Sequence, residues 1–366
     1  MQKSETEALG VIRVPRLGGA EYFISGQAKQ AGKEAELVAA AARSVQEHHA
    51  QVVTCRVDIT MTGRPHFEAL LTKAFGEAAF PVVWLRQYKD KPAGFSLQIH
   101  AVEGLKVRSI YDGSRVCGRV FEDAWAEYYR LHVLPDDVTA TPAEQARQVF
   151  EGMQRLLTAE GMEFSQTVRT WLYTDDILAW YWDLNKVRDA FFEEHGIFQR
   201  LVPASTGIGL ANAEGTALSA ELLAVRPRDG AVRIEAVASP LQCSAMQYRA
   251  SFSRAVSVAT PDLERLYISG TASIDGQGKT VYTGDAAKQV AQTMRVVEAI
   301  LKSRGMGWPQ ATRAMAYYKH SEDMGLLAAY CHQHGIDFPC VHFAGDVCRD
   351  ELLFELELDA MKPCSD

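Results

Sequence analysis

The sequence predicts an α/β (α+β) fold in which one chain holds three copies of a small unit, each with a mixed sheet and helices on its outer face. The clearest repeat pairs residues 160–175, EGMEFSQTVRTWLYTD, with residues 304–319, RGMGWPQATRAMAYYK, at an offset of 144. In addition, a proline-containing strand precedes an alternating strand three times, with spacings of 15, 16 and 16 residues counted from Pro81, Pro203 and Pro339. Recurrence of this kind is typical of duplicated structural units.

Each unit is expected to begin with a strand and to continue into a long helix. The opening strands are predicted at 21–27, 115–121 and 265–274. In the second unit, Thr141-Pro-Ala-Glu144 forms a capping box with proline at the first helical position, and apolar residues then recur with a helical period until Gly161. In the third unit, Asp285 is the expected N-cap and Gly305 ends the helix.

The second half of each unit adds a strand, a second helix and two more strands. That helix is expected to end at Gly196 in the second unit, and to run from a Ser321 cap to Gly335 in the third. The last two strands of the three units are predicted at 78–85 and 96–101, 201–209 and 219–224, and 337–345 and 355–360.

The predicted boundaries of the three units are 1–112, 113–240 and 241–366. The first unit is degenerate, and its segment 50–61 aligns Arg56 with Arg169 and Arg313. Three sheets with helices on one face can pack their open faces together, as three chains do in a homotrimer. We therefore expect a pseudo-trimer within one chain, and a monomer.

Composition and charge exclude several classes of function. The 366 residues carry a net charge of −8, which disfavours nucleic acid or an anionic membrane as the main partner. The sequence contains no run of 18 apolar residues, so it predicts no membrane span. The opening MQKSETEALGVIRVP lacks the apolar core of a secretory signal, so we expect a cytoplasmic protein.

Cysteine and histidine patterns give no indication of a metal or redox site. None of the seven cysteines forms a C-x-x-C pair, and the ten histidines include no H-E-x-x-H. We therefore expect reduced thiols, no metal and no cofactor.

Two short motifs resemble the RidA/YjgF family. In that family the opening strand carries S-G-Q and the last strand V-E-I-E; here Ser25-Gly26-Gln27 and Ser269-Gly270-Thr271 match the first, and Phe354-Glu355-Leu356-Glu357 matches the second. The family also carries an arginine two residues after the proline of the fourth strand, where this sequence has Val83, Ser205 and Val341. The missing arginine argues against imine deamination.

A longer stretch, about residues 110–360, is similar to the chorismatases, a group also called pteridine-dependent deoxygenase-like. The matching segments are PASTGIG at 203–209, FSRAV at 252–256, SGTASI at 269–274 and VCRDELLFELE at 347–357. The resemblance implies a cofactor-independent enzyme with a trimer-like fold, which cleaves the enolpyruvyl ether of chorismate and releases pyruvate.

Glu355 is the strongest candidate for a catalytic group. Its counterparts in the other two units are Ser96 and Ser219, so this strand position is acidic in one unit alone. A carboxyl on an inward strand face has a raised pKa, which lets it act as a general acid near neutral pH. Protonation of the enol ether at its methylene carbon requires such an acid. The alternative is an exposed glutamate on an edge strand.

Candidate substrate-binding groups come from the second and third units. Chorismate is a dianion, and arginine side chains suit its two carboxylates. The candidates for substrate binding are Arg254, Arg169, Tyr248, Tyr173, Ser205, Thr206 and Gly207.

Cys348, seven residues before Glu355, is the candidate determinant of the product. Within the chorismatases, cysteine at this position is associated with 3-hydroxybenzoate, and a small residue with 3,4-dihydroxycyclohexa-1,5-diene carboxylate. The expected products are therefore pyruvate and 3-hydroxybenzoate. Two alternatives stay open: the dihydrodiol acid or a mixture of 3- and 4-hydroxybenzoate, and a non-catalytic RidA-like ligand-binding protein.

Overall fold

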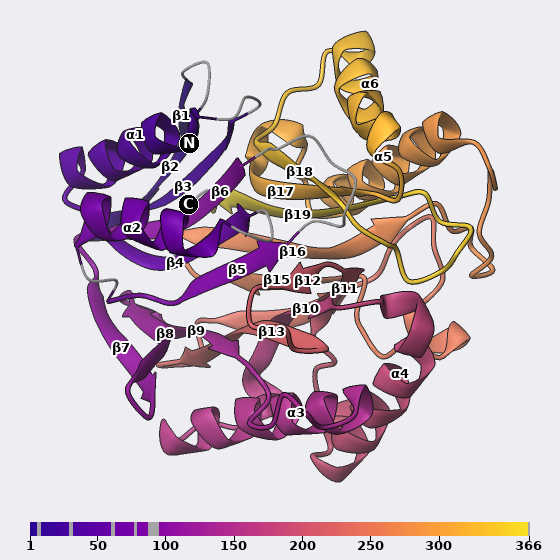
Figure 1. Cartoon of the computed structure of the whole chain (residues 1–366), viewed down its shortest axis with the longest axis horizontal. Helices are drawn as coiled ribbons and strands as arrows, with labels where there is room; N and C mark the ends of the chain where they lie inside the picture. Colours follow the sequence, from indigo (N-terminus) through magenta and orange to yellow (C-terminus); the bar gives the residue numbers. More distant parts are fainter. Residues whose placement is uncertain (6–8, 29–31, 60–62, 77–78, 87–94, 365–366) are drawn as a thin grey trace.

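The described part of the chain forms three mixed sheets with six helices on the outside of the molecule (Figure 1). The computed structural model describes residues 1–366 except 6–8, 29–31, 60–62, 77–78, 87–94 and 365–366. The predicted α/β (α+β) fold of three units is confirmed.

The first sheet has the strand order β1-β2-β3-β6-β4-β5-β12. Its helices α1 and α2 bury apolar residues against the sheet. The elements are β1 Gln2–Glu5, β2 Leu9–Arg16, β3 Gly19–Ala28, α1 Glu34–Glu47, β4 Gln51–Ile59, α2 Arg64–Phe75, β5 Val82–Arg86 and β6 Phe95–Glu103, with the short β12 Ala211–Asn212 added at the β5 edge.

The second sheet has the order β7-β8-β9-β13-β10-β11. Its first helix, α3, begins at the predicted capping box, in which Thr141 and Glu144 bond each other's backbone. The elements are β7 Lys106–Asp112, β8 Arg115–Glu122, β9 Ala126–Val133, α3 Pro142–Ala159, η1 Phe164–Gln166, β10 Thr167–Thr174, α4 Ile177–Glu194, η2 Ile197–Gln199, β11 Ala204–Gly209 and β13 Leu218–Pro227.

The third sheet has the order β14-β15-β16-β19-β17-β18, so corresponding strands lie in the same order in all three sheets. The side chain of Asp285 caps α5 as predicted. The elements are β14 Arg233–Val237, η3 Ala245–Tyr248, β15 Ala255–Ala259, β16 Leu263–Ala272, α5 Ala286–Ser303, η4 Trp308–Gln310, β17 Ala311–Tyr318, η5 Ser321–Gly325, α6 Leu326–His334, β18 Cys340–Ala344 and β19 Phe354–Pro363.

The inner faces of the three sheets share one apolar core. Val83 of the first sheet, Trp171 of the second and Tyr317 of the third belong to the same buried cluster, whereas each helical layer has a cluster of its own. Strand registers confirm the predicted correspondence of the closing strands, since Ser96, Ser219 and Glu355 pair with Asp58, Tyr173 and Tyr317. The alternation of β19 turns Glu355 toward the shared interior.

Three local predictions need correction. The register makes Thr54, not Arg56, the structural counterpart of Arg169 and Arg313, because all three pair with the residue four positions after Ser96, Ser219 and Glu355, whereas the match of arginines in the sequence was two residues out of register. The strand at 115–121 is β8, whereas the true counterpart of β3 and β16 is β9. Ser321 begins a 3-10 turn, and α6 starts only at Leu326.

The unit boundaries at 113 and 241 stay predictions, as does the monomeric state. Strand pairing groups the chain slightly differently, because β7 joins the second sheet and β14 joins the third. Each of these strands lies before the predicted start of its unit.

Candidate active site

A small pocket lies where the second sheet meets the third. Strand β11 runs beside β16, and the Ser269 hydroxyl accepts a hydrogen bond from the Ser205 amide at 2.9 Å. The pocket floor comes from β10, β11, β16 and β19, and the cover comes from α4, the connection before β15 and the turn before β19. The lining residues are Leu172, Tyr181, Leu184, Arg188, Ser205, Gly207, Tyr248, Phe252, Arg254, Gly270, Ala272, Ile274, Cys348, Arg349, Leu352 and Glu355.

Glycine at position 270 makes room for the carboxyl group of Glu355. A side chain at this position would begin with a Cβ that collides with Glu355 Oε1. The Gly270 amide also donates to Thr206 Oγ1 at 3.0 Å, which ties the two sheets together at the floor. The Ser-Gly-Thr motif therefore shapes the pocket through close backbone approach.

Glu355 is a buried carboxyl group that forms no ion pair with any described residue. Burial raises its pKa to about 8, and the neighbouring charge of Glu357 acts in the same direction, while Arg169 and Arg254 oppose the shift. Near neutral pH the group is therefore mostly protonated. A protonated carboxyl that faces a pocket can donate its proton to a bound molecule.

Glu357 lies two residues further along the same face of β19 but has a full set of partners. Its carboxylate accepts hydrogen bonds from Arg169 Nη2 and Trp171 Nε1, both at 3.0 Å, and it pairs with Arg313. Its side chain is fully buried. These contacts mark Glu357 as a structural carboxylate.

Three arginines line the pocket. Arg254, which is 4% exposed, donates through Nε to the Cys243 carbonyl at 3.0 Å, and its Nη2 has no acceptor among the described residues. Arg188 of α4 is equally buried and has a similarly unpartnered Nε. Arg349 follows Cys348 on the turn before β19. The pocket thus gathers three guanidinium groups near the buried carboxyl of Glu355, and guanidinium groups suit the binding of carboxylates.

Cys348 and Tyr181 lie beside Glu355 in the pocket. Burial raises the pKa of the Cys348 thiol to about 12, helped by the nearby Glu355 charge and opposed by Arg349 and a hydrogen bond with Tyr181. The thiol is therefore neutral at physiological pH. It adds a small, uncharged surface to the pocket wall near Glu355.

The structure brings six of the predicted site residues into the pocket: Glu355, Cys348, Arg254, Tyr248, Ser205 and Gly207. Sequence reasoning missed Arg188, Arg349 and Tyr181. Arg349 directly follows Cys348, and that adjacency was the one available signal. Nothing in the pattern of α4 distinguishes Arg188 from the other polar residues of this helix.

Arg169, Tyr173 and Thr206, which were also predicted to contact substrate, do not line the pocket but lie behind its wall. Alternation along β10 turns Arg169 and Tyr173 toward the centre of the three sheets, where Arg169 pairs with Glu357 and the Tyr173 hydroxyl donates to Glu221 at 3.1 Å. Thr206 Oγ1 accepts from Arg169 Nη2 at 2.6 Å. These side chains support the wall behind Glu355.

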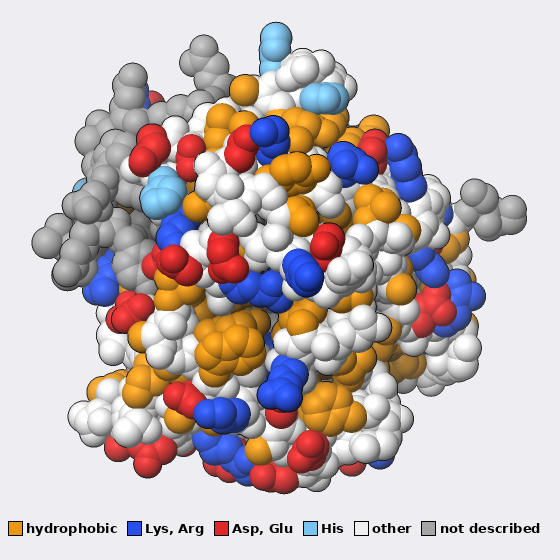
Figure 2. All heavy atoms as spheres, turned by 90° about the vertical axis from the view of Figure 1, so that its right-hand side faces the viewer, with side chains coloured by type: hydrophobic (Ala, Val, Ile, Leu, Met, Phe, Trp, Pro, Cys, Tyr) orange, Lys and Arg blue, Asp and Glu red, His pale blue; other side chains and the backbone are white. Residues whose placement is uncertain are grey.

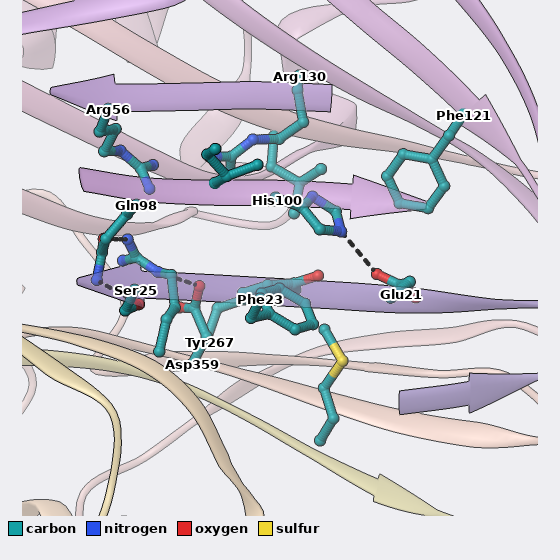
Figure 3. A pocket seen from close by; sticks show the side chains of 14 residues that line it. Glu21, Phe23, Ser25, Arg56, Gln98, His100, Phe121, Arg130, Tyr267 and Asp359 are labelled. Carbon is teal, nitrogen blue, oxygen red and sulfur yellow. Dashed lines mark hydrogen bonds and ion pairs between the residues drawn. The ribbon is translucent and has the colours of Figure 1, made fainter. Parts of the chain in front are cut away.

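A second small cavity lies at the centre, where all three sheets contribute walls (Figure 3). Glu21 bonds His100 at 3.1 Å, as the dashed line shows, and Arg313 pairs with Asp359 at 2.8 Å. Arg56 reaches Glu221 of the second sheet. Opposite charges are paired throughout this cavity, so we interpret it as the joint between the units.

Neither a metal cluster nor a membrane-spanning helix emerges from the described parts of the chain. Within them, no group of three or more His, Cys, Asp and Glu side chains could hold a metal ion. Their helices are also too short or too polar to cross a bilayer.

Comparison with solved structures finds the same arrangement of three units. A crystal structure of a chorismatase superposes with a TM-score of 0.64 and 18% sequence identity, covering 93% of this chain and 98% of that one. This chain has the chorismatase fold. The fold expected from the sequence motifs is thus confirmed over nearly the whole length.

Smaller proteins match about a third of the chain. A putative endoribonuclease L-PSP from Entamoeba histolytica shows 20% identity and a TM-score of 0.31, covering 36% of this chain and all of that one. RidA from an Antarctic Psychrobacter species shows 17% identity and a TM-score of 0.28, covering 34% of this chain and 98% of its own. No family model and no curated protein matches the sequence.

Proposed function

We propose that this chain is a chorismatase, a cofactor-independent enzyme that cleaves the enolpyruvyl ether of chorismate into pyruvate and 3-hydroxybenzoate. The observation that carries the proposal is Glu355: a buried carboxyl with a raised pKa and no ion pair, in a pocket that also holds three arginines. A proton donor and anion-binding groups in one pocket are what an acidic enol ether requires.

Glu355 acts as the general acid. Its proton goes to the methylene carbon of the enolpyruvyl group, which generates an oxocarbenium ion at the adjacent carbon. An oxygen nucleophile adds to that carbon, the bond from that carbon to the ether oxygen breaks, and pyruvate leaves while the ether oxygen stays on the ring and takes up a proton. When the nucleophile is water, 3-hydroxybenzoate forms only if the ring then loses its other hydroxyl group and one ring hydrogen as water. Formation of a hydroxybenzoate from chorismate consumes no net water, whereas formation of the dihydrodiol acid consumes one.

The arginines bind the two carboxylates of the substrate. Arg254 and Arg188 are both buried with an unpartnered nitrogen, and Arg349 lies on the opposite turn. The outer face near α4 mixes acidic, basic and apolar side chains (Figure 2), so it has no uniform positive charge that would attract a dianion. Attraction of the substrate therefore depends on the three arginines of the pocket.

The test is direct incubation of the purified protein with chorismate, with pyruvate followed through a coupled dehydrogenase and the ring product identified by mass. Prompt pyruvate together with 3-hydroxybenzoate is expected. Pyruvate with the dihydrodiol acid, or with mixed hydroxybenzoates, would keep the enzyme class and change the product. Absence of pyruvate at high protein concentration would contradict the proposal and favour a RidA-like ligand-binding protein.

A further inference from the structure

The pocket is almost filled in the present conformation. Its cavity volume is about 30 Å³, which holds roughly two water molecules. Pockets for ligands of ordinary size measure about 300–1,000 Å³. A six-membered ring that carries two carboxylate-bearing groups therefore cannot enter unless one of the covering elements moves.

Two of the three covers are firmly fixed. Helix α4 buries Leu184, Phe191 and Phe192 in the apolar layer of the second unit. The turn before β19 is held by Gln289, whose side chain donates to the Glu351 carbonyl and accepts from the Leu353 amide, both at 2.8 Å. Displacing either element would break a buried cluster or a bonded turn.

The third cover is a strap, residues 243–252, between two anchor points. At its start, Gln242 donates to the carbonyls of Ala272 and Ile274, each at 2.9 Å. At its end, the Ser253 amide donates to the Pro203 carbonyl at 3.0 Å. The strap between them contains a single 3-10 turn, η3, and leaves Met246 48% exposed. The strap is also tied to α4, where Ser251 Oγ donates to Asp189 Oδ1 at 2.5 Å. None of its residues belongs to a hydrophobic cluster, so it is the cover that can move with the least disruption.

Tyr248 fastens this strap over the pocket. The guanidinium groups of Arg254 and Arg349 both lie over its ring, 5.3 and 4.8 Å from the ring centroid. Arg349 belongs to the fixed turn, where its Nη1 donates to the Gly278 carbonyl at 2.9 Å. The two cation–π contacts join the strap to the turn and orient both arginines.

We infer that the strap is the gate of the pocket and that Tyr248 is a positioning residue, whose ring holds Arg254 and Arg349 together when the gate is closed. Substrate carboxylates meet both guanidinium groups in that closed state. This last step rests on the proposed function, whereas the gate itself does not. The Tyr248 hydroxyl also forms a side-chain hydrogen bond with Arg254, so both the ring and the hydroxyl hold this arginine.

Alkylation of Cys348 measures the opening of the gate without any substrate. The full-length protein is treated with iodoacetamide, and modification of each cysteine is followed by peptide mass analysis. We expect Tyr248→Leu to increase the rate at Cys348 roughly tenfold, because two cation–π contacts are lost. Tyr248→Phe keeps the ring contacts but loses the hydrogen bond to Arg254, so its rate at Cys348 should rise less than that of Tyr248→Leu.

Cys331, half-buried on α6 and outside the pocket, serves as the internal control. Its rate should be the same in all three proteins. Equal rates at Cys348 in the wild type and Tyr248→Leu would overturn the inference. A parallel rise at Cys331 would also contradict it, since that result indicates general loosening.

Kinetics with chorismate test the positioning role separately. Tyr248→Leu should raise KM about tenfold with a smaller change in kcat, and Tyr248→Phe, which keeps the ring, should raise KM less than Tyr248→Leu. A protein that alkylates as expected but releases no pyruvate would keep the gate and refute the proposed function. Normal pyruvate release by the wild type, together with equal alkylation rates in the wild type and Tyr248→Leu, would support the proposed function and refute the gate.

Discussion

Glu355 and Glu357 lie two residues apart on one face of β19, and both are buried, but their surroundings are opposite. Glu357 is bonded by Arg169, Arg313 and Trp171 at the centre of the molecule. Glu355 faces a pocket and has no ion-pair partner among the described residues. Burial with partners keeps a carboxylate charged and structural, whereas burial without them keeps a carboxyl protonated and reactive.

The other two units support this distinction. At the position of Glu357, the second unit has Glu221, which pairs with Arg56 and Arg130, and the first unit has Gln98. At the position of Glu355, both have serine. The paired position is thus polar in every unit, as expected for a joint between sheets. The unpaired position is acidic only beside the pocket.

Glu355→Gln gives the largest expected effect. The amide cannot supply a proton, so we expect the rate of pyruvate release to fall about 10³-fold. Because glutamine fills the same space, the fold should be preserved. The measurement is the coupled pyruvate assay at saturating chorismate, with circular dichroism as the control for folding. A loss of less than tenfold would exclude Glu355 as the acid.

Glu357→Gln should instead act on stability. Removal of this carboxylate leaves Arg169 buried without a charged partner, so the free energy of unfolding should fall by about 4 kcal/mol. Urea denaturation measures it. The matched control is Glu163→Gln, which breaks the exposed pair with Arg200 and should cost less than about 1 kcal/mol. Similar costs for the two variants would refute the assignment of a structural role.

The pH dependence of stability tests the raised pKa of Glu355. The pKa of Glu355 is about 8 in the folded chain against an ordinary value of 4.5, so the folded state retains the proton longer than the unfolded state. Below about pH 4.5 Glu355 is protonated in both the folded and the unfolded state, so its burial adds no ionisation cost to the free energy of folding. Between about pH 4.5 and 8 the free energy of unfolding should fall by up to about 1.4 kcal/mol per pH unit from this group, and then level off.

The measurement is urea denaturation of the wild type and Glu355→Gln at several pH values. The variant lacks the titrating group, so its stability relative to the wild type should grow across that range. Activity of the wild type should also decline above about pH 8, as the acid ionises. A constant difference in stability between the two proteins would show that Glu355 titrates near its ordinary value.

The sequence predicted the repeats, the closing strands and most of the pocket, because these depend on local periodicity and on short motifs. It failed where the outcome depended on contacts between units. Alternation shows that Arg169 and Tyr173 share a face of one strand, but it cannot show whether that face meets the pocket or the centre. Arg188 lines a pocket with Tyr248 and Cys348 of the third unit, and the counterpart of Arg56 follows from the pairing of β4 with β6, which a match of one residue type does not reveal.

Cys348→Ala is the finest test, because it should change the product more than the rate. The neutral thiol contacts the pocket beside Glu355, and alanine would leave space for water near the oxocarbenium carbon. We expect the rate of pyruvate release to change less than about tenfold, with the ring product shifting from 3-hydroxybenzoate toward the dihydrodiol acid. Cys340→Ala, at a cysteine outside the pocket, is the control. An unchanged product in Cys348→Ala would show that Cys348 does not determine the product. Glu355 would remain the proposed acid, and Tyr181 would become the candidate that selects the nucleophile.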